Sequence, residues 1–98
     1  MSTSGDAPTG LTPRLLARVR ADYAADETFV IEELREASSG GQDRERVLAA
    51  IVLGAAGDVD RLCELVELSR LDWRDVLCAG GLADSAWAER LAAVLGDA

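Results

Sequence analysis

Apolar residues spaced three and four positions apart constrain this chain more than any other feature of its sequence. That spacing recurs in segment after segment and matches the turn of an α-helix, whereas a half-buried strand alternates apolar and polar residues. No segment shows sustained alternation, and no Asn-Gly or Asp-Gly dipeptide marks a hairpin. The pattern therefore predicts an all-α fold, a small compact bundle of about five to six short helices.

Helix start and stop signals separate the apolar stripes. Residues that can cap a helix N-terminus precede them, namely Thr12, Asp26, Asp43, Asp58, Asp72, and Asp84 or Ser85. The predicted stops are Gly57, Gly80-Gly81 and Gly96, and residues 38–41 form the clearest loop. Phe29 and Val94 are expected to face inward. The helix that follows Asp58 has the widest stripe and is expected to lie at the centre.

Length and composition indicate one globular domain. A chain of 98 residues is close to the commonest domain size, and its hydrophobic content of 49% is enough for one core. Residues 1–11 are rich in Ser, Thr, Gly, Asp and Pro and are expected to form a disordered leader. Residues 12–98 are expected to form a single all-helical domain.

The net charge of −8 restricts the classes of partner. A negative field disfavours nucleic acid and anionic membrane surfaces, because affinity for both comes largely from cationic contacts. It favours solubility or a basic protein partner. The longest apolar run, residues 48–56, is too short to span a membrane, and no signal peptide is recognised. We therefore expect a cytoplasmic protein in which Cys63 and Cys78 are reduced core residues.

No catalytic, cofactor-binding or metal-binding residues are expected. The chain has no His, and its two cysteines are too few for a zinc site and lack the usual partner for nucleophilic catalysis. The aspartates are explained as helix caps, and Glu32, Glu33 and Glu36 as the solvated face of a helix. The two glycine pairs, Gly40-Gly41 and Gly80-Gly81, lack the glycine spacing and the Lys of a phosphate-binding loop.

Two groups of residues are candidates for an interface. Trp73 either plugs the end of the bundle, which we favour, or forms an interface anchor with Arg74, since Trp and Arg are enriched in binding hot spots. Four further apolar residues extend beyond a single stripe and predict a symmetric homodimer: Val52, Leu53, Leu65 and Leu68.

Three motifs carry a resemblance that spans Arg44 to Leu95. They are residues 49–53 (Ala-Ala-Ile-Val-Leu), the break Gly57-Asp58, and residues 72–77 (Asp-Trp-Arg-Asp-Val-Leu). In these features the chain resembles short uncharacterised bacterial all-helical proteins. The resemblance implies a helical fold and no functional residues.

The leading functional hypothesis is a non-enzymatic protein that acts through protein–protein interaction, with another protein or with itself. A specific version is an immunity protein or antitoxin whose acidic surface neutralises a basic partner. A second hypothesis is a helix-turn-helix regulator built from residues 72–81 and 84–95, although Arg90 is the only cation on its reading helix. A third is an enzyme with carboxylates around an apolar pocket.

Overall fold

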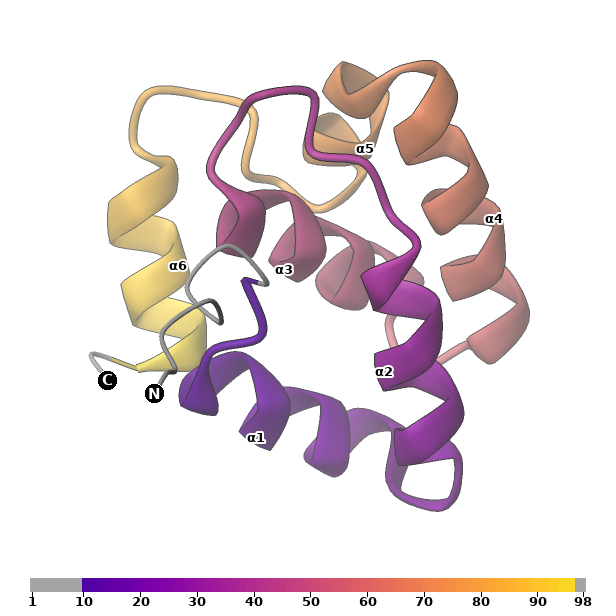
Figure 1. The fold of residues 1–98 in the computed structure, drawn as a ribbon. Coiled ribbons are helices and arrows are strands. Elements are labelled where there is room, and N and C mark those ends of the chain that lie inside the picture. Colours follow the sequence, from indigo (N-terminus) through magenta and orange to yellow (C-terminus); the bar gives the residue numbers. More distant parts are fainter. Residues whose placement is uncertain (1–9, 97–98) are drawn as a thin grey trace, which may run out of the picture.

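Helices account for all the regular structure in residues 10–96, the part of the chain that the computed structural model describes. In chain order they are α1 (Pro13–Tyr23), the 3₁₀ turn η2 (Ala24–Asp26), α2 (Glu27–Arg35), α3 (Arg44–Ala55), α4 (Val59–Leu71), α5 (Trp73–Ala79) and α6 (Trp87–Leu95). No strand occurs between residues 10 and 96, and the helices pack around one core (Figure 1). The predicted all-α bundle is confirmed.

Most of the predicted N-terminal caps are made. Thr12 Oγ1 accepts a hydrogen bond from the Leu15 amide at 3.3 Å, and Pro13 follows as the first helical residue. The Asp43 carboxylate accepts a hydrogen bond from the Arg46 amide. In the same way, the Asp58 carboxylate accepts from the Arg61 amide, and the Asp72 carboxylate accepts from the Arg74 amide. These bonds satisfy N–H groups that the helix leaves unpaired, so they help to set where α3, α4 and α5 begin.

Two predicted caps are wrong. Asp26 makes no side-chain cap, because the chain enters α2 through the 3₁₀ turn rather than through an extended residue. The Asp84 carboxylate accepts from the Ala86 amide at 3.0 Å, inside the turn that precedes α6. The residue before α6 is Ala86, which cannot cap with its side chain, so neither Asp84 nor Ser85 is the N-cap.

The end of α3 also differs from the prediction. The left-handed conformation begins at Ala56 (φ 52°, ψ 42°), one residue before the expected stop at Gly57 (φ 87°). A left-handed backbone brings the β-carbon of an L-residue close to the following carbonyl oxygen. Ala56 is therefore a strained position, and it is the only residue with a positive φ other than glycine between residues 10 and 96.

The central helix is α3, not α4 as expected. It packs against α1, α4, α5 and α6, and every residue from 47 to 52 is buried (Figure 1). Small residues on α3 let its neighbours approach closely: a β-carbon on Gly80, at the end of α5, would lie 2.4 Å from Ala50 Cα. The apolar stripe of α4 is wide because α4 packs against α2, α3 and α5.

Two side chains expected to face inward are exposed. Phe29 is 45% exposed and Val94 is 44% exposed. On α2 the buried face is filled by Val30 and Leu34, and on α6 it is filled by Leu91. Each of these short helices presents one narrow face to the core, so an apolar residue off that face meets solvent.

The folded domain begins earlier than predicted. Gly10 is buried against Arg44, and Leu11 packs against the core. The expectation of a disordered leader is therefore wrong for these two residues. Residues 1–9 lie outside the described part of the chain.

An ion pair ties the start of α1 to α3. Arg14 donates from Nε and Nη2 to the two carboxylate oxygens of Glu45, each at 2.7 Å, and the Thr12 hydroxyl also donates to that carboxylate. Both side chains are largely shielded from water. The Arg14 guanidinium and the Thr12 hydroxyl hold the pKa of Glu45 below its ordinary value, against the smaller effect of burial.

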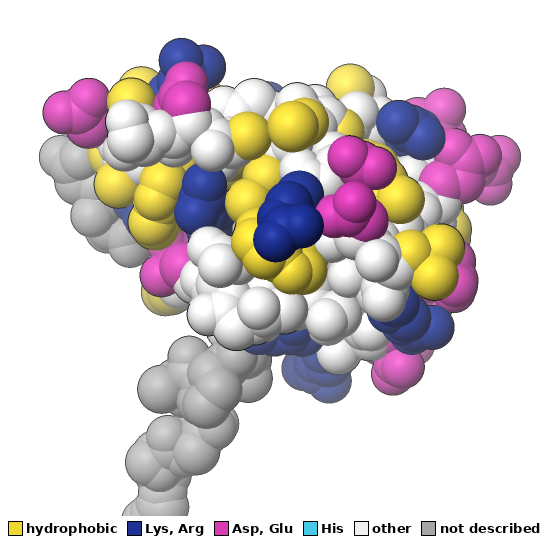
Figure 2. Space-filling view, turned by 90° about the horizontal axis from the view of Figure 1, so that it is seen from above, with side chains coloured by type: hydrophobic (Ala, Val, Ile, Leu, Met, Phe, Trp, Pro, Cys, Tyr) yellow, Lys and Arg dark blue, Asp and Glu magenta, His cyan; other side chains and the backbone are white. Residues whose placement is uncertain are grey.

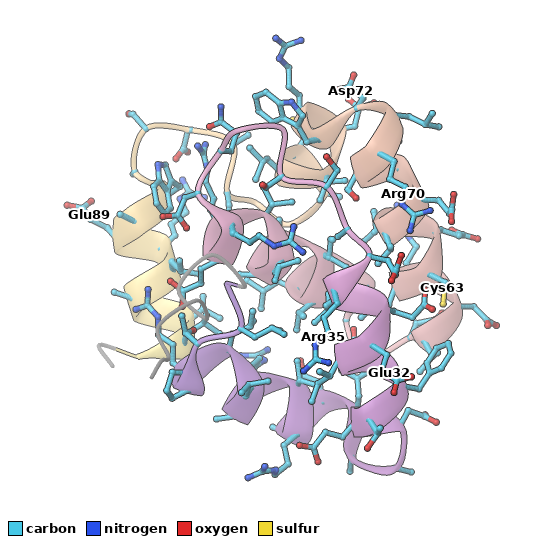
Figure 3. All side chains as sticks on the ribbon, viewed as in Figure 1. Glu32, Arg35, Cys63, Arg70, Asp72 and Glu89 are labelled. Carbon is cyan, nitrogen blue, oxygen red and sulfur yellow. The ribbon has the colours of Figure 1, made fainter. Side chains whose placement is uncertain are left out.

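Two further side chains, Tyr23 and Arg70, make hydrogen bonds between segments that are far apart in the sequence. Tyr23, the last residue of α1, donates its hydroxyl to the Val52 carbonyl at 3.1 Å and accepts from the Gly57 amide at 3.2 Å. Arg70 extends from α4 and donates to the Glu36 carbonyl at 3.1 Å, at the end of α2 (Figure 3).

Within residues 10–96, no helix is both long enough and apolar enough to cross a lipid bilayer.

Candidate functional site

The α4–α5 junction determines where Trp73 lies. Asp72 ends α4 through its amide, which donates to the Leu68 carbonyl at 2.7 Å, and begins α5 through its carboxylate, which accepts from the Arg74 amide at 3.0 Å. One extended residue therefore separates the two helices, and Figure 3 shows it at the end of the molecule where α5 lies. Trp73 is consequently the first residue of α5.

The indole of Trp73 packs on the loop between α2 and α3. A β-carbon on Gly40 would lie 2.1 Å from Trp73 Cδ1 and 2.2 Å from Nε1, so the ring occupies the space that a side chain would need. Trp73 is half-buried and packs against the core. One side of the Trp73 ring packs on the protein, as the favoured interpretation expected. The other side lines the surface, as the alternative expected.

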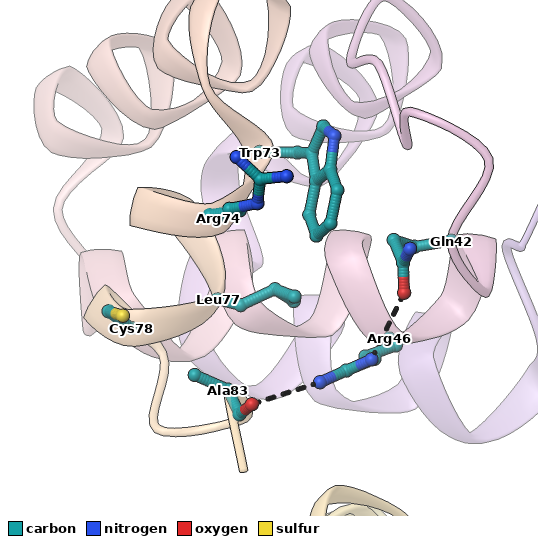
Figure 4. A pocket seen from close by; sticks show the side chains of 7 residues that line it. All are labelled: Gln42, Arg46, Trp73, Arg74, Leu77, Cys78 and Ala83. Atoms are coloured by element: carbon teal, nitrogen blue, oxygen red, sulfur yellow. Dashed lines mark hydrogen bonds between the residues drawn. The ribbon is translucent and has the colours of Figure 1, made fainter. Parts of the chain in front are cut away.

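A hollow of about 390 Å³ opens beside the exposed side of Trp73 (Figure 4). We call it the Trp73 hollow, and its lining residues are Gln42, Arg46, Trp73, Arg74, Leu77, Cys78 and Ala83. They come from α3, α5 and the loops before α3 and after α5. Figure 2 looks down on the end of the molecule where α5 lies, and there hydrophobic side chains are interspersed with both basic and acidic ones.

Two arginines border the Trp73 hollow. Arg46 donates to the carbonyls of Leu82 (2.9 Å) and Ala83 (3.3 Å) and to the Gln42 side chain (3.3 Å), and its guanidinium lies 4.8 Å from the centre of the Trp87 ring. The Arg74 guanidinium lies 5.1 Å from the centre of the Trp73 ring and makes no side-chain hydrogen bond with residues 10–96. Such cation–π contacts orient a guanidinium without neutralising its charge.

Most arginines whose pairing is described in this acidic protein form an ion pair, and Arg35, Arg46 and Arg74 do not within residues 10–96. Ion pairs with carboxylates are formed by Arg14, Arg18, Arg20, Arg61, Arg70 and Arg90. Neither Arg46 nor Arg74 forms an ion pair within the described part of the chain. The Trp73 hollow therefore combines an apolar floor with two arginines that form no ion pair within residues 10–96.

The structure separates the six residues predicted for an interface. Trp73 and Arg74 lie together at the hollow. Val52 and Leu65 are fully buried (0% exposed), so the expectation that they form an uncovered patch is wrong. Both pack inside the bundle because α3 and α4 have neighbours on more than one side. Leu53 and Leu68 are partly buried against the core.

Leu53 lines a second hollow of about 330 Å³, on another part of the surface. Its other lining residues are Gly80, Gly81, Leu82, Arg90, Ala93 and Val94. Arg90 is ion-paired with Asp84 at 2.8 Å. The arginine of this second hollow is therefore ion-paired, unlike the two arginines of the first.

The two cysteines are free, as predicted, but the prediction that they are core residues is wrong for both. Cys63 is partly buried, whereas Cys78 is exposed at the Trp73 hollow. Burial, together with the neighbouring Glu33 carboxylate, raises the pKa of the Cys63 thiol and so disfavours the nucleophilic thiolate. Among residues 10–96, no group of three or more His, Cys, Asp or Glu side chains is placed to hold a metal ion.

Sequence reasoning missed most of the residues that line the hollow. Gln42, just before α3, and Arg46, in the first turn of α3, meet Cys78, on α5, only through tertiary packing. The Gly40-Gly41 pair was the available signal, because a glycine loop permits a large ring to pack on the backbone. Nothing in the sequence indicates that Trp73 is that ring.

No family model matches the sequence, and no curated protein or solved structure matches it significantly.

Proposed function

We propose that this protein is a non-enzymatic interaction module that binds another protein through the Trp73 hollow. The observation that carries the proposal is the pairing of a partly exposed indole with an exposed guanidinium over a concave surface. Trp and Arg dominate binding hot spots because they offer large contact areas, and concave sites exclude water from those contacts. We also propose a cytosolic location, where free cysteines stay reduced.

The surroundings of the hollow support this choice of surface. Leu71, two residues before Trp73 in the sequence, is 84% exposed, the greatest exposure among the large hydrophobic residues between residues 10 and 96. An exposed apolar side chain adds contact area that a partner can cover. Trp73 itself is held by Gly40 on its buried side, so binding would not need to order it.

An inhibitor of a basic partner, such as an immunity protein or antitoxin, is a second candidate. The glutamates Glu36, Glu64 and Glu67, on α2 and α4, have side chains 66–72% exposed. Their ion pairs with arginine are exposed too, and such pairs are weak enough to exchange for a basic partner. A surface of this kind steers a cationic protein toward binding.

The structure offers less support for a helix-turn-helix regulator. In that motif the two helices pack on each other, whereas here α5 packs mainly on α3 and α4, and α6 packs on α1 and α3. The ion pair with Asp84 also occupies Arg90, the only cation on the reading helix. We therefore keep the two protein-binding candidates.

Affinity capture from the native cell tests the proposed function when two charge-reversal variants are compared. Arg74→Glu changes the hollow, and Arg20→Glu makes the same change at a 72% exposed side chain on α1. We expect one or more proteins to be captured by the wild type and by Arg20→Glu and to be lost with Arg74→Glu. Partners retained by Arg74→Glu but lost when Glu64 and Glu67 are changed to Gln would instead favour the acidic surface. Equal capture by all the variants would contradict both candidates.

A further inference from the structure

We propose that the occupant of the Trp73 hollow is an acidic segment of the partner protein. In this complex, carboxylates of the segment lie against Arg46 and Arg74, and a neighbouring apolar side chain packs on Trp73 and Leu77. This inference rests on the proposed function and adds the chemistry of the partner.

The charge of the hollow selects an anion. Within residues 10–96, every hydrogen bond from the Arg46 side chain goes to a neutral oxygen, of Gln42, Leu82 or Ala83. A guanidinium carries five N–H donors, and the Arg46 and Arg74 side chains together leave several of them for a ligand. Hydrogen bonds from arginine to a carboxylate are stronger than those to a neutral acceptor.

The apolar part of the hollow selects a hydrophobic side chain next to that anion. Leu77 is only 3% exposed and forms the floor, while the half-buried Trp73 ring forms one wall (Figure 4). The volume of about 390 Å³ is ample for one large side chain. A ligand that brings only charge would leave this surface wet, so the recognised unit combines both features.

The openness of the hollow to solvent favours a chain segment over a free small molecule. Among the lining residues, Arg74, Cys78 and Ala83 are exposed, and only Leu77 is buried. Tight small-molecule sites usually enclose most of their ligand's surface. Here a free ligand would stay largely in water, whereas a peptide can bury one side chain and continue across the neighbouring surface.

The overall charge of −8 argues against nucleic acid as the source of the anion. A polyanion repels the whole protein and needs many cationic contacts. A short segment with one or two carboxylates feels mainly the two nearby arginines, because salt screens charges more than about 8–10 Å away. An oligonucleotide is therefore a comparison in the test rather than an equal candidate.

A peptide selection tests the inference without a known partner. A random peptide library displayed on phage is selected on the wild-type protein and counter-selected on Arg74→Gln. We expect the enriched peptides to contain Asp or Glu beside a large apolar residue. The selected peptide is then synthesised, and its binding is measured by Trp73 fluorescence in a Trp87→Phe background, where Trp73 is the only tryptophan.

Three variants at exposed arginines give the expected pattern. Arg74→Gln should weaken binding of the selected peptide by about fivefold to tenfold, the loss of one charge-assisted contact. Arg74→Lys keeps the positive charge and should retain most of the affinity, and Arg20→Gln should leave it unchanged. Raising the salt concentration should weaken binding to the wild type more than to Arg74→Gln.

Several outcomes overturn the inference. They are enrichment of basic peptides, no enrichment at all, equal affinity for wild type and Arg74→Gln, or displacement of the peptide by a single-stranded oligonucleotide. If cellular capture is lost with Arg74→Glu but Arg74→Gln retains it, the binding surface is correct and its acidic ligand is wrong. If no cellular partner depends on Arg74, the proposed function fails whatever the peptides show.

Discussion

Trp73 occupies the space in which a side chain at Gly40 would begin, since a β-carbon there would lie 2.1 Å from Trp73 Cδ1. The two residues are far apart in sequence, in the loop between α2 and α3 and at the start of α5. The absence of a side chain at position 40 therefore sets the position of the indole, and through it the shape of the Trp73 hollow.

Gly40→Ala should destabilise the protein more than Gly41→Ala. Both glycines have a positive φ, 58° and 86°, so either substitution costs about 1–2 kcal/mol of backbone strain. Only Gly40→Ala also displaces a packed ring, which adds about 1–3 kcal/mol, because nothing lies within 4 Å of a β-carbon at position 41. Urea denaturation measures the difference. Equal midpoints for the two variants would show that the ring moves away freely.

Trp73→Ala should reduce the free energy of unfolding by about 1–3 kcal/mol. A fully buried aromatic costs about 3–5 kcal/mol to remove, and this ring is only partly buried. The matched control is Leu71→Ala, at an 84% exposed side chain, which should change stability by less than about 0.5 kcal/mol. A Trp73→Ala midpoint equal to that of the wild type would mean that the contact with Gly40 contributes no stability.

Gly80→Ala should be among the most destabilising small substitutions in the domain. Its new β-carbon would lie 2.4 Å from Ala50 Cα and 2.5 Å from the Ala50 carbonyl oxygen, and backbone atoms cannot swing aside as a flexible side chain can. We expect a loss of about 3 kcal/mol. Gly81→Ala is the control, because its β-carbon meets nothing within 4 Å and only its φ of 75° is unfavourable. Thermal denaturation that ranks Gly81→Ala as the worse variant would contradict the close packing of α5 on α3.

Ala56→Gly should stabilise the protein by about 0.5–1 kcal/mol. Glycine adopts the left-handed backbone at this position without strain, which outweighs its greater freedom in the unfolded chain. Ala55→Gly, one residue earlier and still helical, should destabilise by about 1 kcal/mol. Melting temperatures that move in the same direction for both variants would refute the left-handed cap.

Glu45→Gln should destabilise the protein at neutral pH by about 1–3 kcal/mol, through the loss of a bidentate ion pair with Arg14. Because the pKa of Glu45 is lower in the folded than in the unfolded protein, its contribution is complete above the unfolded value of about 4.3. The contribution is lost as the pH falls through the folded pKa. The difference in stability between wild type and Glu45→Gln should therefore be constant from pH 7 to 5 and shrink in more acidic solution.

The control for this pH series is Glu64→Gln, at a carboxylate that is 66% exposed and pairs with Arg61. An exposed pair of this kind contributes at most about 0.5 kcal/mol. A Glu45→Gln difference as small as that of Glu64→Gln would show that the contact between α1 and α3 is not maintained in solution.

The helices could be predicted closely from the sequence because their signals are local. Asp43, Asp58 and Asp72 cap the first turn that follows them, a contact within three residues. Burial was predicted less well because it depends on how many neighbours a helix has. Leu65 is buried because α4 packs against three helices, α2, α3 and α5. Phe29 is exposed because α2 packs mainly against two helices, α1 and α4, and the turn η2. Periodicity identifies an apolar face but not the elements that cover it.

The candidate site could be predicted only in part, for the same reason. Trp73 and Arg74 are adjacent in sequence, and their residue types mark them as binding candidates. Arg46 belongs to another helix, and its separation from Arg74 in sequence gives no sign that the two border one hollow. The lack of a carboxylate partner for either arginine follows from the tertiary positions of the acidic residues, which no local pattern contains.

The Tyr23 hydroxyl joins the end of α1 to both Val52 and Gly57, on either side of the strained end of α3. Proton exchange at the Gly57 amide therefore reports on a distant event, because this N–H is released to water only when the tyrosine withdraws. If α1 opens as a unit, the Gly57 amide and the amides of α1 will exchange with the same free energy of opening. The end of α1 thus holds the α3–α4 turn closed through the Tyr23 hydroxyl. The exchange rate of the Gly57 amide proton then reports the opening of α1.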